Sequence, residues 1–145
     1  MVAATTELEL VQPQGAQFEH IRYPDSFRLT TTQLIDDGTT ALQLSYVNFE
    51  RINQSVSGVH PIVLRIIKLL AAPKDGTPEQ NAIYIQKYLP PQIDSLEYRM
   101  DTCLRMAEEI DKVFSNYLKL VEETDQLYRA TQGAPRSIFQ FRGVR

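Results

Sequence analysis

The sequence is poor in residues that bind metals or form disulfides, with one cysteine and two histidines among 145 residues. A single cysteine cannot form an internal disulfide, which excludes a disulfide-stapled secreted fold. Thiolate zinc sites need several cysteines, and di-iron bundles need Glu-x-x-His pairs, which the sequence lacks. His20 and His60 have no second histidine or carboxylate at metal-site spacing. The sequence therefore predicts no metal and no other cofactor.

Long apolar runs are also missing. The longest mostly apolar stretch, residues 59–72, is interrupted by Arg65 and Lys68 and is shorter than the roughly 20 residues that span a bilayer. Residues 1–10 lack the basic segment and apolar core of a signal peptide. The net charge of −3 and the pI of 5.4 argue against a nucleic-acid-binding protein. We therefore expect a soluble, cytoplasmic protein.

Motifs of catalysis are absent as well. There is no Gly-rich phosphate-binding loop and no Gly-x-Ser-x-Gly sequence. Adjacent acids such as Glu108 and Glu109 point to different sides of a helix, whereas general acid–base pairs must converge. Cys103 lies within an apolar repeat, which predicts a buried and inert thiol. No catalytic residue is predicted, and we expect the chain not to be an enzyme.

What the sequence does contain is an apolar repeat in its C-terminal half, spaced alternately by three and four residues. Only a helix places such positions on one side, and a seven-residue repeat favours helix-on-helix packing. The spacing predicts one long helix from about Pro91 to Thr131. The repeat consists of Ile93, Leu96, Met100, Cys103, Ala107, Ile110, Phe114, Tyr117, Val121, Thr124 and Tyr128.

The apolar stripe of this helix is wider than that of a two-stranded coiled coil. With Ile93 at heptad position a and Leu96 at d, four of the g positions are apolar: Met106, Val113, Leu120 and Leu127. A wide stripe needs more than one neighbouring helix. Residues 40–56, 61–72 and 78–89 supply candidates, so the fold class is all-α: a helical bundle with a long C-terminal coiled-coil-like helix and an extended N-terminal arm.

The predicted organisation has three parts. Residues 1–23 form an N-terminal arm, extended or disordered; residues 24–133 form the helical bundle; residues 134–145 form a basic-aromatic tail. Gly38 either separates two helices or kinks a single one. Gly58 suits a left-handed helix cap. Pro90 and Pro91 should stop or bend the helix that begins at Pro78, because proline cannot donate a backbone hydrogen bond.

The tail combines cationic and aromatic side chains without any acid. Such a segment can bind an acidic protein groove, RNA or an anionic membrane, or it can fold back onto the bundle. Its candidate partner-binding residues are Arg136, Phe139, Phe141 and Arg142.

These features favour a non-enzymatic interaction or scaffold subunit that binds itself or another protein by helix packing; a nucleic-acid partner is not expected. Small residues of the apolar repeat that lie opposite large ones favour a single register between packed helices. Two alternatives remain: a small-molecule-binding bundle or cofactor-free enzyme around Tyr84, Tyr88, Tyr98 and Tyr117, and a peripheral membrane protein that uses residues 59–72 and the tail. The predicted anchors of the protein interface are Ile110, Phe114, Tyr117, Val121 and Tyr128.

Overall fold

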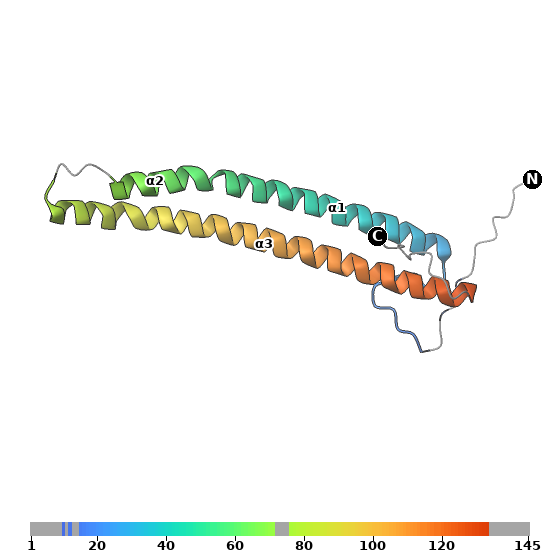
Figure 1. Cartoon of the computed structure of the whole chain (residues 1–145). Helices are drawn as coiled ribbons and strands as arrows, with labels where there is room; N and C mark the ends of the chain where they lie inside the picture. Colours follow the sequence, from blue (N-terminus) through green and yellow to red (C-terminus); the bar gives the residue numbers. More distant parts are fainter. Residues whose placement is uncertain (1–9, 11, 13–14, 72–75, 134–145) are drawn as a thin grey trace, which may run out of the picture. The chain divides into compact units, whose positions relative to one another are not determined.

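The structure is a computed structural model that describes Leu10, Gln12 and residues 15–71 and 76–133, and helices are its regular secondary structure from Phe27 onward. Three helices follow in order: α1 Phe27–Ser57, α2 Val59–Ala71 and α3 Pro78–Gln132 (Figure 1). These residues contain no β-strand. The predicted all-α class is confirmed, and so is the long C-terminal helix, which reaches 55 residues.

Helix α1 begins where polar residues offer a cap. The backbone N–H of Leu29 donates to Ser26 Oγ at 3.2 Å, which satisfies one of the free amides of the first turn. The helix then runs through Gly38 without interruption, so the prediction of two helices was wrong. Gly38 faces Tyr117 of α3, and packing against that ring outweighs the weak helix propensity of glycine.

A single residue, Gly58, separates α1 from α2. Its backbone does not take the left-handed conformation predicted for it, because the only described glycines with positive φ are Gly15 and Gly133. The guanidinium of Arg99 occupies the place where a Cβ atom at this position would lie. The close approach of α3, and not a helix cap, therefore explains this glycine.

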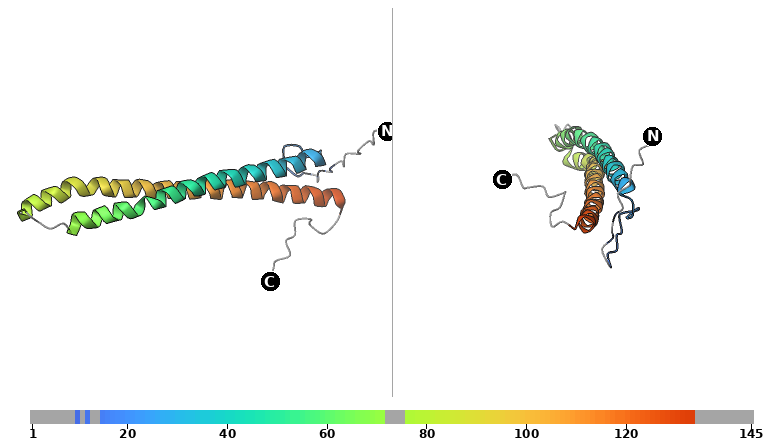
Figure 2. Two further views of the ribbon diagram at one scale, coloured as in Figure 1. Left: turned by 90° about the horizontal axis from the view of Figure 1, so that it is seen from above. Right: turned by 90° about the vertical axis from the view of Figure 1, so that its right-hand side faces the viewer.

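The start of α3 is a capping box, as the sequence predicts. Gln80 N–H donates to Thr77 Oγ1 at 3.3 Å, and Thr77 N–H donates to Gln80 Oε1 at 3.0 Å. Pro90 and Pro91 lie inside this helix, which Figure 2 draws as one ribbon, so of the two predicted alternatives, a stop or a bend, the stop was wrong. Both prolines are exposed, which leaves water access to the carbonyl groups that lose their helical partner.

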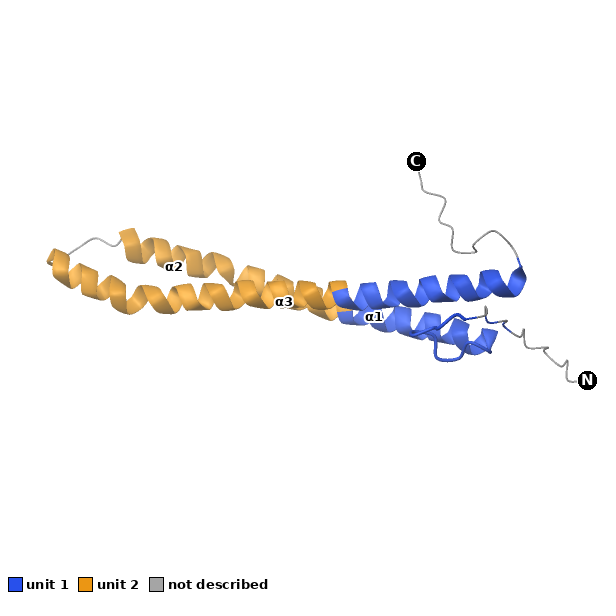
Figure 3. Ribbon diagram, turned by 90° about the horizontal axis from the view of Figure 1, so that it is seen from below, with its two compact units in different colours: residues 1–44, 112–145 blue, residues 45–111 orange. Residues whose placement is uncertain are grey.

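The helices contribute to two compact units, coloured separately in Figure 3. Unit 1 comprises residues 1–44 and 112–145, and unit 2 comprises residues 45–111. In each unit a stretch of α3 packs antiparallel to an earlier helix: Thr31 contacts Tyr128 in unit 1, while Ser55 contacts Arg99 and Asn48 contacts Glu109 in unit 2.

Candidate interaction surfaces

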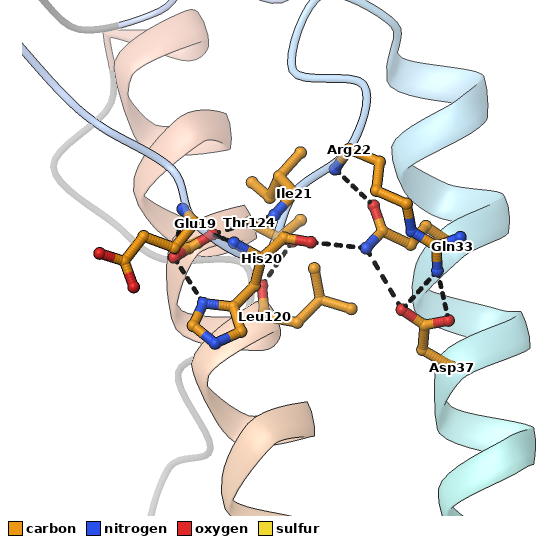
Figure 4. A network of polar contacts seen from close by, with 9 residues as sticks. Glu19, His20, Ile21, Arg22, Gln33, Asp37, Leu120 and Thr124 are labelled. Atoms are coloured by element: carbon orange, nitrogen blue, oxygen red, sulfur yellow. Dashed lines mark hydrogen bonds and ion pairs between the residues drawn. The ribbon is translucent and has the colours of Figure 1, made fainter.

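The described part of the N-terminal arm is attached to α3 through one carboxylate. Glu123 Oε2 accepts the backbone N–H groups of His20 and Ile21 at 2.8 and 3.1 Å. Glu123 Oε1 accepts the N–H of Glu19 at 3.0 Å and lies 2.8 Å from His20 Nδ1 (Figure 4). Three consecutive amides thus converge on one side chain, as they would on a bound anion.

This setting lowers the pKa of Glu123. Burial of the side chain, which is 16% exposed, would by itself raise the pKa because it disfavours the charged form. The hydrogen bonds from the His20 ring and from the three amides favour the carboxylate and outweigh that effect. The arm is therefore held by an ionised side chain at neutral pH.

Helix α1 holds the other side of the arm through Gln33. Its amide nitrogen donates to the carbonyl of His20 at 2.7 Å, and its Oε1 accepts the N–H of Arg22 at 3.0 Å. Asp37 completes the network, because its two oxygens accept from Arg22 Nη2 at 2.7 and 2.9 Å (Figure 4). The hydrogen bonds to Asp37 and its negative charge raise the pKa of Arg22 further above its already high value, so the guanidinium stays charged.

Apolar contacts complete the attachment. Leu10 and Ile21 are buried in one cluster with Leu120, Leu127 and Tyr128 of α3, and Phe18 packs against its edge. The sequence left the arm extended or disordered, and the contacts above hold residues 18–22 against α1 and α3. The sequence gives no sign of this docking, since about 100 residues separate the groups that meet.

The predicted anchors of the interface lie in different surroundings. Tyr128 is buried, stacks on Phe27 with ring centroids 5.2 Å apart, and lies 3.1 Å from Thr31 Oγ1. Tyr117 is half-buried, and its hydroxyl donates to the carbonyl of Leu34 at 3.0 Å. These two residues belong to the internal packing of unit 1 as well as to the predicted interface.

The other predicted anchors are more accessible. Ile110 and Val121 are half-buried, whereas Phe114 is 41% exposed. Their role in binding a partner stays a prediction. The four predicted residues of the tail lie outside the described residues: Arg136, Phe139, Phe141 and Arg142.

The seam between the helices of unit 2 uses a different edge of the α3 stripe from the one predicted. The buried or half-buried α3 residues of unit 2 occupy heptad positions d and g, and also c at Asn81, Ser95 and Thr102. The a positions Ile93 and Met100 remain exposed. On the facing helices α1 and α2 the buried residues of this seam are Ser45, Asn48 and Ile62. The d and g residues of this seam are Leu96, Arg99, Cys103, Met106 and Ile110.

Unit 2 leaves a second set of apolar residues uncovered. We call it the apolar face. Each of its residues directly follows a seam residue in the sequence: Phe49 follows Asn48, and Met100 follows Arg99. Its members, all exposed, are Tyr46, Phe49, Val56, Val63, Ile67 and Leu70 from α1 and α2, and Ile93, Met100 and Leu104 from α3.

Helix geometry places these side chains on one side of unit 2. A step of one residue turns about 100° around a helix axis. Because the paired helices run in opposite directions, a step toward either C-terminus turns toward the same side of the pair. The apolar face therefore lies on one side of the pair and receives side chains from both members.

The residues that precede the seam test this geometry. Arg65 and Lys68 precede seam residues of α2, Tyr84 and Tyr88 precede seam residues of α3, and these four side chains line one hollow of about 270 Å³. The same relation holds for a second hollow of about 370 Å³ between Arg51 of α1 and Arg105 of α3. This side, opposite the apolar face, we call the basic face.

The tyrosines of the small-molecule alternative do not surround one cavity. Tyr84 and Tyr88 lie together, with ring centroids 4.6 Å apart, and Lys87 Nζ lies 5.4 Å from the Tyr88 centroid. Tyr98 lines the second hollow of unit 2. Tyr117 belongs to unit 1 and lines a hollow there with His20 and Asn116.

The described residues offer no group of His, Cys, Asp and Glu side chains that could hold a metal ion. Cys103, predicted to be a buried thiol, is half-buried in the unit 2 seam, where its thiol lies 3.9 Å from the carbonyl oxygen of Ile52. Among the helices of the described part, none is long and apolar enough to cross a bilayer.

Comparison with known proteins does not add to these observations. No family model, no curated protein and no solved structure matches the chain. The function has to be argued from the surfaces described above.

Proposed function

We propose that the chain is a non-enzymatic helical subunit that binds another protein through helix packing, and that the apolar face of unit 2 is the binding surface. The observation that carries the proposal is the exposure of large apolar side chains at helical spacing on both members of one pair, with Met100 62% and Leu104 60% exposed. Contiguous apolar surface of this kind is typical of interfaces. The face contains no lysine or arginine and only two acids along α3, Glu97 and Asp111.

The shape of the face favours a helix as its occupant. Two antiparallel helices with adjacent apolar stripes form a groove into which a third helix packs at an interaxial distance of about 8–10 Å. The residues of the face recur along each helix at intervals of three, four or seven, which matches the ridges of an incoming helix. A second copy of the chain and a helical segment of another protein both satisfy this chemistry.

The test uses substitutions on the face that leave the seam intact. Met100→Glu combined with Leu104→Glu places two charges on exposed positions, so the fold should survive. The matched control, Val47→Glu, changes an exposed apolar residue that precedes a seam residue and therefore lies on the basic face. Circular dichroism establishes that both variants remain helical.

Light scattering then measures the mass in solution against the 16.6 kDa of one chain. For self-association we expect a multiple of this mass, which the double variant reduces to one chain and the control does not. For a different partner we expect the wild type and the control to retain a protein that the double variant loses in affinity capture. If all three proteins are monomeric and capture the same set of proteins, the proposal is wrong.

A further inference from the structure

One hollow of the basic face, which we call the arginine hollow, is lined by three arginines, Arg51 of α1 and Arg99 and Arg105 of α3. Its volume of about 370 Å³ falls in the lower part of the range of roughly 300–1,000 Å³ found for ligand pockets. The other lining residues include no acid: Gln54, Ser55, Tyr98, Thr102 and Met106.

The protein neutralises few of these charges. Arg99 Nη1 donates to the carbonyl of Ser55 at 3.3 Å, and Arg51 Nη1 lies 3.9 Å from Met106 Sδ, a weak acceptor. In the described ranges none of the three arginines forms an ion pair with a carboxylate. Each guanidinium carries five N–H donors, so most donors around the hollow remain available to a ligand.

Two acids line an adjoining hollow. Arg105 borders that hollow too, together with Asp101 and Glu108 of α3. These acids are absent from the lining of the arginine hollow, whose charged lining residues are all arginines. Like charges that converge without a counter-ion destabilise one another, and an anion bound between them removes this cost.

One of the arginines is held in place before any ligand binds. The guanidinium of Arg99 lies against Gly58, in the space that a Cβ atom would fill, and its hydrogen bond to Ser55 fixes its orientation. A half-buried, anchored arginine loses little side-chain entropy on binding. This arrangement favours recognition of a ligand over a purely solvated surface charge.

We propose that this hollow binds the oligophosphate group of a small soluble molecule. Arginine binds phosphate oxygens with paired N–H donors, and arginines on two helices suit a chain of phosphates better than a single carboxylate. Tyr98, which is 70% exposed at the rim, offers a ring on which a base can stack. Inorganic tripolyphosphate and a nucleoside triphosphate share the recognised group.

Isothermal titration calorimetry with tripolyphosphate tests the proposal. We expect one binding site per chain, and we expect Arg51→Gln with Arg105→Gln to weaken binding at least tenfold. Both side chains are exposed, so the fold should persist. The control, Arg65→Gln with Lys68→Gln, removes the same amount of charge from the other hollow of the same face and should leave the affinity within about twofold.

Two further arms make the outcome decisive. ATP should bind at least as tightly as tripolyphosphate, and a tighter affinity that Tyr98→Leu abolishes would assign the nucleoside part to the tyrosine. If the double variant loses helicity, Arg105→Glu alone replaces it and should also weaken binding. Absence of binding at millimolar tripolyphosphate, or equal weakening by the control variant, would overturn the proposal. Neither result bears on the apolar face.

Discussion

Replacement of Glu123 by glutamine should detach the N-terminal arm. The carboxylate makes four polar contacts, three to backbone N–H groups and one to the His20 ring. Glutamine keeps the shape but exchanges one acceptor oxygen for an NH₂ group, which cannot accept a hydrogen bond. With the NH₂ group in the place of Oε2, the contacts to the N–H groups of His20 and Ile21 are lost; in the place of Oε1, the contact to the N–H of Glu19 is lost.

The size of the effect follows from those contacts. A hydrogen bond to a charged group contributes about 1.5–3 kcal/mol, and a buried amide left without a partner costs about 1–3 kcal/mol. The arm can detach from α3 instead of keeping unpaired N–H groups at its binding site. The free energy lost by the substitution therefore cannot exceed the free energy with which the arm is docked. We expect the docked arm to lose about 2 kcal/mol, which corresponds to roughly a 30-fold rise in the exchange rate of its protected amides.

Hydrogen exchange at the amide of Ile21, whose residue is only 6% exposed, measures this directly. The control is Glu122→Gln, which changes the exposed neighbouring acid by the same atoms. Unchanged exchange at Ile21 in Glu123→Gln would refute the assignment of Glu123 as the residue that holds the arm. A fall in protection with both variants would point to the net charge of α3 instead.

Three further predictions concern single residues. Gly38→Ala should lower the free energy of unfolding, since its Cβ atom would lie 2.7 Å from Tyr117 Oη. In a Tyr117→Ala background the same change should instead raise the free energy of unfolding by about 1 kcal/mol, through helix propensity. If urea unfolding of the four proteins shows no change of sign between the two backgrounds, the contact between Gly38 and Tyr117 is contradicted. Pro91→Ala should raise the free energy of unfolding of unit 2 by about 1–3 kcal/mol, because alanine restores a backbone N–H donor inside α3 at an exposed position. An unchanged urea midpoint would contradict this prediction. Because the pKa of Glu123 is lower in the folded chain, the stabilisation that its carboxylate gives the arm is complete above the ordinary pKa of a glutamate and is lost as the pH falls through the lowered value. Protection of the arm amides from exchange should therefore decline only in acid, and Glu123→Gln should remove that decline.

Local signals in the sequence were sufficient for most of the helices. The Thr77–Gln80 capping box consists of contacts between residues three positions apart, so it depends little on the rest of the chain. The same local rules failed at Gly38 and at Pro90–Pro91. At Gly38 a tertiary contact with Tyr117 outweighs propensity, and the exposed prolines leave only solvent-accessible carbonyl groups without partners.

Part of the apolar face is visible as a periodic pattern in the sequence. Tyr46, Phe49, Val56 and Val63 follow helical spacing as clearly as the repeat of the long helix does. Their exposure, however, depends on which side of α1 meets α3. Small or polar residues such as Ala41, Ser45 and Asn48 form that side, and a search for apolar periodicity passes over them.

The sequence by itself determined that the chain is helical, where its longest helix ends and that this helix carries more apolar surface than one neighbour can cover. Only the tertiary structure decided which edge of that stripe is buried and that Glu123 receives the arm. The physical reason is range: helix signals act over three or four residues, whereas the choice between equally apolar edges depends on side chains about 50 to 100 positions away.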